Sequence, residues 1–180
     1  MSLPQPRTNA KERLIEAAME IISAQGVQEL TLEGVAAIAG VTKGGLIYHF
    51  KTKDELLGAL VTHMLEQHKL RTAHVGHAAK SLLNAWVDEA LDMSPTEKQL
   101  RANLLTAAAN HPHLVGPVRE QYERGYRDIQ KLASNEGLAL VIAVATDGIA
   151  LVEMLNLCQF TPAQRTAMRS ALAALVQQID

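Results

Sequence analysis

Alternating helix-start and helix-stop signals constrain this sequence more strongly than any other feature. Runs with an apolar residue every three to four positions follow residues that can cap a helix, and end at glycine or at an X-Pro break. Alanine and leucine, which are strong helix formers, supply 27 and 25 of the residues. The sequence therefore predicts an all-α protein with about nine helices. The predicted caps are Asn9, Thr31, Thr42, Thr52, Ser94 and Thr161.

Two short predicted helices, separated by Gly40-Val41-Thr42, have the spacing of a helix-turn-helix, whose second helix enters the DNA major groove. The segment from Gly34 to Lys53 contains three lysines and no acidic residue, although residues 1–60 are about neutral as a whole. Local positive charge of this kind is what phosphate contacts require. Gly44 and Gly45 are poor helix formers, so we interpret them as a surface that approaches DNA closely; loose turn geometry is the alternative.

The ordered string TLEGVAAIAGVTKGGLIYHFKTKDELL, residues 31–57, resembles the DNA-binding segment of TetR-type transcriptional regulators. The resemblance extends over residues 8–68 and implies an N-terminal three-helix DNA-binding domain there. It also implies a larger helical ligand-binding and dimerisation domain over residues 69–180. Leu46 and Phe50 are implied to be core residues. The implied DNA contacts are Thr31, Thr42, Lys43, Gly44, Gly45, Ile47, Tyr48, His49 and Lys53.

The two last predicted helices, from Leu138 to Leu157 and from Pro162 to Ile179, are strongly apolar. A helix that is apolar nearly all round must be buried on most sides, either in the core of one chain or in a four-helix bundle with a second copy. The resemblance favours the second arrangement, a homodimer on a pseudo-palindromic double-stranded operator. The expected interface residues are Val144, Leu151, Met168, Leu172, Leu175, Val176 and Ile179.

A small apolar or amphipathic ligand is the other partner that the resemblance implies. We expect a repressor that the ligand releases from its operator, with the fourth helix carrying the coupling because it begins at the DNA and ends near Met64. The alternative is a DNA-binding protein whose larger domain serves only dimerisation. Binding sites for such ligands are typically pockets with a mainly apolar lining. The candidate lining residues are Met64, Trp86, Leu104, Tyr122 and Tyr126.

Other classes of function find little support in the sequence. The motifs of zinc proteases, serine hydrolases and phosphate-binding loops are absent, so we expect no enzyme activity. Six histidines outside the recognition helix lack a cysteine or a carboxylate at ligand spacing, so we expect neither a metal site nor a cofactor. They are His63, His68, His74, His77, His111 and His113.

Composition is consistent with a cytoplasmic protein that does not enter a membrane. The formal net charge is −2, and the single cysteine, Cys158, cannot form an internal disulfide. The first nine residues have no apolar run, so we expect no signal peptide. The most apolar stretch, Leu138 to Ala145, is too short to span a bilayer, and we expect Thr146, Asp147 and Gly148 to interrupt it.

Overall fold

The computed structural model describes residues 9–72, 75–76 and 78–179 of the 180-residue chain. This part of the chain forms nine α-helices and one short 3-10 helix and contains no strand, which confirms the all-α prediction. The helices are α1 (Ala10–Gln25), η1 (Val27–Glu29), α2 (Leu32–Ala39), α3 (Lys43–His49), α4 (Lys53–Thr72), α5 (Ala79–Asp92), α6 (Pro95–Asn110), α7 (Pro112–Leu132), α8 (Glu136–Met154) and α9 (Pro162–Val176).

The predicted capping residues start the helices through hydrogen bonds to their first turns. Asn9 forms a complete capping box with Glu12 at the start of α1. The hydroxyl oxygens of Thr31 and Thr42 each accept a hydrogen bond of 3.1 Å from a backbone amide in the first turn of α2 and α3. Each such cap is worth about 1 kcal/mol of helix stability. Gly40 ends α2 at a φ of 61°, a left-handed conformation that favours glycine.

One hydrophobic core joins the N-terminal helices to the rest of the chain. Leu14, Leu46 and Leu57 are fully buried in it, and Leu104 of α6 and Leu114 of α7 belong to the same cluster. The core therefore runs across residue 68, where we expected one domain to end. Because α4 is shared in this way, the division into residues 8–68 and 69–180 remains a proposal.

A second hydrophobic core lies among α5, α7, α8 and α9. Leu172, Val176 and Ile179 are 6%, 0% and 0% exposed in this core, so their side chains are covered by the same chain. The prediction that these three residues contact a partner is therefore wrong. Met168 and Leu175 are partly buried against the same cluster. The coiled-coil-like spacing of α9 describes packing within one protomer.

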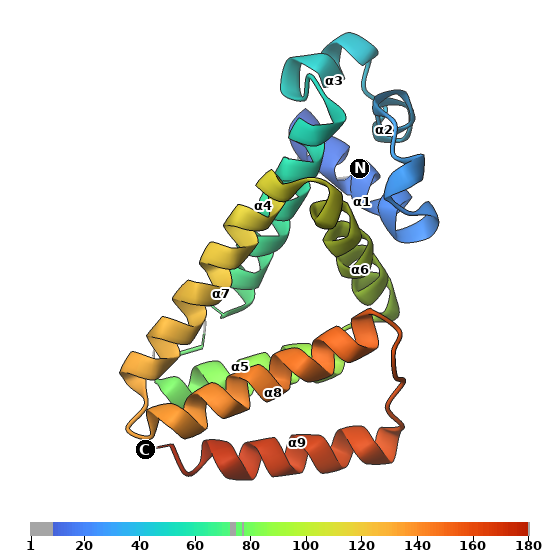
Figure 1. Ribbon diagram of the computed structural model, residues 1–180. Helices are drawn as coiled ribbons and strands as arrows, with labels where there is room; N and C mark the ends of the chain where they lie inside the picture. Colours follow the sequence, from blue (N-terminus) through green and yellow to red (C-terminus); the bar gives the residue numbers. More distant parts are fainter. Residues whose placement is uncertain (1–8, 73–74, 77, 180) are drawn as a thin grey trace, which may run out of the picture.

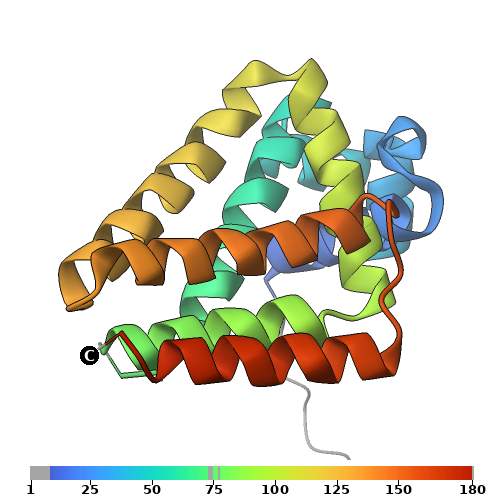
Figure 2. The ribbon, with the colours of Figure 1, turned by 60° about the horizontal axis from the view of Figure 1, so that its bottom comes forward.

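Helices α4 to α8 form a triangle below the helix-turn-helix (Figure 1). Helices α4 and α7 run side by side along one edge, α6 forms a second edge, and α5 and α8 close the base. Helix α9 packs on the outer side of the base, where it lies beside α5 (Figure 2). The space inside this triangle is the place where a cavity can form.

Helix α8 has about the predicted length, but it is more exposed than a helix that is apolar nearly all round was expected to be. The helix continues through Thr146, Asp147 and Gly148, so by length and composition alone α8 could cross a membrane, contrary to the expectation from the shorter apolar stretch. One face packs on α5, α7 and α9. The other face leaves Val141 and Val144 more than half exposed. The helix therefore belongs to the protein's own core on one side and leaves an apolar face uncovered on the other.

Candidate nucleic-acid interface and internal cavity

Helix α3 holds two buried anchors and presents an outward face between them. Leu46 is fully buried and Phe50 is 3% exposed, as expected for core residues. Between them, Ile47 is 43% and Tyr48 is 84% exposed. His49 is half-buried, and its ring meets the Tyr48 ring edge-on with centroids 5.1 Å apart. An exposed tyrosine with a half-buried histidine beside it, on a short and firmly anchored helix, has the form of a surface that inserts into a groove.

Gly44 and Gly45 both lie on α3, but their surroundings differ. A Cβ atom on Gly44 would meet nothing within 4 Å, which leaves the interpretation as a close-approach surface open. A Cβ atom on Gly45 would lie 2.8 Å from Val41 Cγ1 and 3.2 Å from Thr42 Oγ1. Gly45 is therefore explained by the turn and the cap of its own chain.

Two of the three lysines of this region, Lys43 and Lys53, make side-chain contacts within the protein. Lys43 Nζ lies 2.8 Å from the Glu33 carboxylate, and both side chains are mostly exposed. This hydrogen bond lowers the pKa of Glu33 and raises the pKa of Lys43. Lys53 Nζ donates a hydrogen bond of 2.8 Å to the Val27 carbonyl oxygen at η1, so Lys53 also fixes the start of α4. Sequence reasoning missed Glu33 because it stands one residue outside the acid-free segment.

The structure brings the predicted DNA contacts to one end of the molecule. Thr31 and Thr42 are exposed at the starts of α2 and α3, and each hydroxyl that accepts a cap hydrogen bond still has its own proton to donate. Lys43 and Tyr48 lie on the same helix as the two glycines. Lys51, in the turn before α4, is exposed as well. Hydroxyl, ammonium and aromatic groups of this kind suit contacts to phosphates and base edges.

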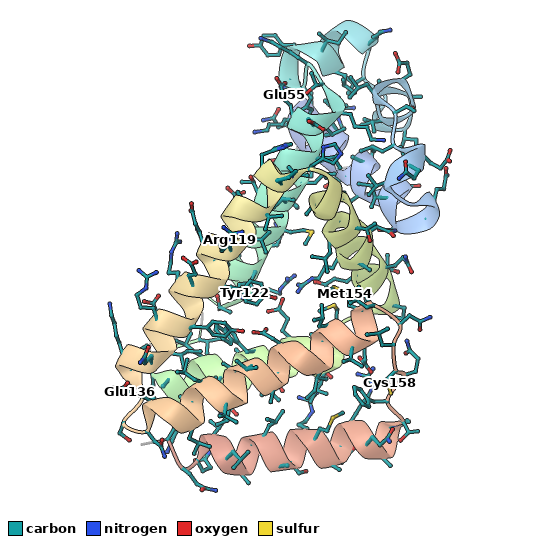
Figure 3. All side chains as sticks on the ribbon, in the orientation of Figure 1. Glu55, Arg119, Tyr122, Glu136, Met154 and Cys158 are labelled. Carbon is teal, nitrogen blue, oxygen red and sulfur yellow. The ribbon has the colours of Figure 1, made fainter. Side chains whose placement is uncertain are left out.

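A cavity of about 280 Å³ lies between the two hydrophobic cores and is lined from α4 to α8. Four of the five predicted lining residues reach it, namely Met64, Trp86, Leu104 and Tyr122. Figure 3 places Tyr122 of α7 and Met154 of α8 on opposite sides of this space. The fifth predicted residue, Tyr126, does not line the cavity, and instead packs its ring against Trp86 and Tyr122 from behind the wall.

The cavity wall contains a charged network that the sequence pattern did not reveal. The Glu89 carboxylate lies 2.8 Å from His68 Nδ1, 2.6 Å from Arg101 and 3.0 Å from Arg71. Burial opposes its ionisation, but the hydrogen bonds and charges of His68 and Arg101 outweigh burial and lower the pKa of Glu89 to about 2. Only the four-residue spacing of Glu97 and Arg101, which also form an ion pair, was visible in the sequence.

A second carboxylate, Asp147, faces the cavity from α8. The Tyr126 hydroxyl donates a short hydrogen bond to it. Burial raises the pKa of Asp147, and the Tyr126 hydrogen bond only partly offsets this effect. Burial and the same hydrogen bond raise the pKa of Tyr126. The cavity is therefore mainly apolar, with a few polar groups that are already held in place.

Comparisons with known proteins agree with this arrangement. Residues 14–60 match the sequence model of bacterial regulatory proteins of the tetR family, and residues 80–177 match that of the tetracyclin repressor-like C-terminal domain. An HTH-type transcriptional regulator from the dhlA 5' region of Xanthobacter autotrophicus is 30% identical over 152 residues, which are 77% of this chain and 75% of the relative. The regulator SrpR of Pseudomonas putida is 32% identical over 108 residues, 58% of this chain, and the match spans only half of SrpR.

Solved structures extend the similarity to the whole fold. A TetR-family regulator from Rhodococcus superposes with a TM-score of 0.72 over 96% of this chain and 99% of its own, at 18% identity. The multidrug binding protein EbrR, solved with ethidium, superposes with a TM-score of 0.69 over 93% of this chain and 98% of its own, at 26% identity. The fold and the exposed recognition helix define a helix-turn-helix DNA-binding protein. The chain belongs to the TetR family of transcriptional regulators.

Proposed function

We propose that this chain is a repressor that binds a pseudo-palindromic operator as a homodimer and leaves it when a small molecule fills the internal cavity. The observation that carries the proposal is the path of α4. This helix begins at Lys53 beside the helix-turn-helix, and its residues Val61, Met64 and His68 line the cavity. A single rigid element therefore touches both sites, which is the geometry that coupling between them requires.

For the DNA contacts, we propose the exposed face of α3 and the helix starts around it. Tyr48 and His49 would read or brace base edges, and the threonine hydroxyls and lysine ammonium groups would bind phosphates. Lys43 would exchange its contact with Glu33 for a phosphate. The full set is Thr31, Thr42, Lys43, Gly44, Gly45, Ile47, Tyr48, His49 and Lys53.

For the dimer interface, we propose the exposed face of α8. Val141 and Val144 are 63% and 57% exposed there, whereas Leu151, which is 44% exposed, also lines the internal cavity. The neighbouring helix α9 carries the small exposed residues Ala171 and Ala174. Two copies of this pair of helices would form a four-helix bundle. In such a dimer the two recognition helices would engage half-sites about 34–36 Å apart.

For the effector, we propose a small apolar or amphipathic molecule. The cavity wall is mainly apolar and aromatic, and the related protein EbrR was solved with ethidium. The alternative function, DNA binding with a larger domain used only for dimerisation, is favoured by one observation: Glu89 already has three partners within the chain and needs no ligand to satisfy it.

A pair of titrations tests the effector mechanism. A metabolite screen for compounds that raise the melting temperature supplies the ligand. The ligand is then titrated into the free protein and into the protein–operator complex. We expect weaker binding to the complex by a factor of roughly 5–150, because coupling of about 1–3 kcal/mol is reciprocal. Equal affinity in both titrations would remove the repressor-release mechanism and leave the dimerisation-only alternative.

A further inference from the structure

Two histidines and one aspartate meet where α4 comes closest to the corner between α6 and α7. Asp54 is in the first turn of α4, and His111 and His113 stand on either side of Pro112, at the start of α7. His111 Nδ1 lies 3.0 Å from Asp54 Oδ1, and His113 Nε2 lies 4.0 Å from Asp54 Oδ2. One potential ligand atom from each of the three side chains lies within 4.8 Å of the other two. The fold thus brings together groups that are far apart in the sequence.

These separations are close to those of a metal site. Zinc binds histidine nitrogen and carboxylate oxygen at about 2.0–2.2 Å, so two ligands at a tetrahedral angle lie roughly 3.3–3.5 Å apart. The two separations above fall on either side of this value. His113 is 56% exposed, so its side chain can move the short distance that coordination requires. The Asp54 and His111 side chains are 50% and 34% exposed, which leaves the cluster open to an ion from solvent.

The backbone holds the ligands from two separate elements. The His111 amide donates to the Ala107 and Ala108 carbonyl oxygens at 3.0 and 3.1 Å, and the His111 carbonyl oxygen accepts from the Leu114 amide at 2.9 Å. His111 is therefore fixed at the end of α6 and at the start of α7 together. On the other side, the Thr52 hydroxyl oxygen accepts a hydrogen bond of 3.1 Å from the Glu55 amide, which fixes the first turn of α4 that carries Asp54.

An ordinary ion pair accounts for only part of this arrangement. A single histidine beside Asp54 would make that pair, whereas here two imidazole rings approach the same carboxylate, edge to face with centroids 5.9 Å apart. We propose that Asp54, His111 and His113 bind one divalent transition-metal ion of the zinc type, with water completing the coordination. Two imidazoles and a carboxylate suit Zn²⁺, Cu²⁺ or Ni²⁺ and are a poor set for Mg²⁺, which prefers oxygen ligands.

This proposal departs from the expectation that the histidines form no metal site. The sequence offered no carboxylate at ligand spacing because Asp54 approaches His111 and His113 only in the folded chain. His74 and His77, which we had also considered, lie outside the described residues. A bound ion would tie the first turn of α4 to the α6–α7 corner. Any effect on operator affinity rests on the proposed function, but binding of the ion does not.

Metal titration of the untagged, full-length chain tests the site. Calorimetry with Zn²⁺ is expected to give one ion per chain, and Co²⁺ is expected to give the visible absorption bands of four- or five-coordinate cobalt with nitrogen and oxygen ligands. Asp54→Asn and His113→Asn should each weaken Zn²⁺ at least ten-fold. His63→Asn, which changes a histidine of α4 outside the cluster, is the matched control and should leave the affinity unchanged.

Circular dichroism of the metal-free variants establishes that they remain folded, which the exposure of Asp54 and His113 leads us to expect. Absence of saturable Zn²⁺ binding to the folded wild-type chain at concentrations up to about a hundred micromolar would overturn the proposal. So would Zn²⁺ binding that Asp54→Asn and His113→Asn both leave intact, because the ion would then be held elsewhere. Neither result depends on whether the protein responds to an effector.

Discussion

Helices α3 and α8 both expose large apolar side chains, but their surroundings differ. On α3, Ile47 and Tyr48 are exposed beside glycine, threonine and lysine residues on a helix of seven residues. On α8, Val141 and Val144 are exposed on a helix of 19 residues, next to Leu140 and Ala145. An exposed apolar side chain therefore does not by itself indicate the kind of partner.

The neighbours of the exposed side chains distinguish the two surfaces. Around α3, Lys43, Lys51 and capping threonines supply the groups that bind phosphates. On the exposed face of α8, the adjacent residues Leu140, Val141, Val144 and Ala145 are all apolar. A polyanion matches the first surface, and an equally apolar surface, such as a second copy of α8, matches the second.

The largest expected effect separates the exposed face of α8 from the core beneath it. Val144→Asp is expected to abolish the dimer and leave a folded monomer, because a charge at the centre of an apolar interface costs roughly 3–5 kcal/mol. Leu172→Asp is expected to unfold the protomer instead, because Leu172 is buried within one chain. Sedimentation equilibrium reports the mass, and circular dichroism reports the helix content.

Val144→Ala serves as the control and should remain dimeric. A wild-type protein that sediments as a monomer at micromolar concentration would contradict the proposed interface. A folded, monomeric Leu172→Asp would restore α9 as the interface that the sequence pattern first suggested.

The next largest effect concerns α3. Tyr48→Ala combined with His49→Ala is expected to weaken operator binding at least a hundred-fold, about 3 kcal/mol, without destabilising the fold. Tyr48 is 84% exposed and therefore contributes little to the core. Fluorescence anisotropy with labelled operator measures the affinity. Leu70→Ala, an exposed change near the other end of α4, should bind normally, and normal binding by the double variant would contradict the assignment of the recognition helix.

The sequence predicted the α3 region well because the signals there are local. Thr31 and Thr42 cap the helices that follow them, Gly40 adopts the left-handed conformation at the end of α2, and Leu46 and Phe50 are buried as expected. The caps and the glycine turn depend on residues within one or two turns of the helix, so a single sequence contains the information that they need. The burial of Leu46 and Phe50 was expected from the resemblance to TetR-type regulators, since it depends on packing against other helices.

The C-terminal region was predicted less well because its features depend on contacts between distant elements. The spacing of Leu172, Val176 and Ile179 shows that one face of α9 is buried, but it does not identify what covers that face. The partners of Glu89 come from α4 and α6, and Asp54 meets His111 only across the α4–α7 contact. Periodicity carries no information about such pairs.

The third prediction, with a smaller expected effect, concerns the ion pairs of Glu89. Because folding lowers the pKa of Glu89 from 4.5 to about 2, its ion pairs stabilise the fold fully above the ordinary carboxyl pKa. The full contribution is about 3 kcal/mol, and it is lost as the pH falls from about 4.5 towards 2, with about 1 kcal/mol gone at pH 4.

Urea denaturation at pH 7 and pH 4 measures this loss. Glu89→Gln should be less stable than the wild type at pH 7, and its free energy of unfolding should fall by about 1 kcal/mol less on going to pH 4. Glu120→Gln, an exposed change on α7, should behave as the wild type. Equal losses in the wild type and in Glu89→Gln would contradict the role of this network.

The smallest expected effect concerns the charge that distinguishes α3 from α8. Lys43 pairs with Glu33 in the free protein, so DNA must compete with a carboxylate for this ammonium group. Glu33→Gln should therefore strengthen DNA binding a few-fold on all sequences, since it frees Lys43 and removes a negative charge from the surface. Lys43→Ala should weaken all sequences about equally and reduce the slope of log affinity against log salt by about one.

A double-mutant cycle completes the test, because Glu33→Gln can act only partly through Lys43. Glu33→Gln should strengthen DNA binding less in the Lys43→Ala background than in the wild type. The difference between the two gains in affinity measures the part of the effect that comes from freeing Lys43. Lys53→Ala is a useful comparison, because the Lys53 ammonium group also donates a hydrogen bond to the Val27 carbonyl oxygen. This substitution should therefore lower the melting temperature as well as the salt slope. If Lys43→Ala leaves the salt slope unchanged, Lys43 remains paired with Glu33 when the protein binds DNA. The positive charge that distinguishes the α3 surface from the α8 surface would then come from Lys51 and Lys53.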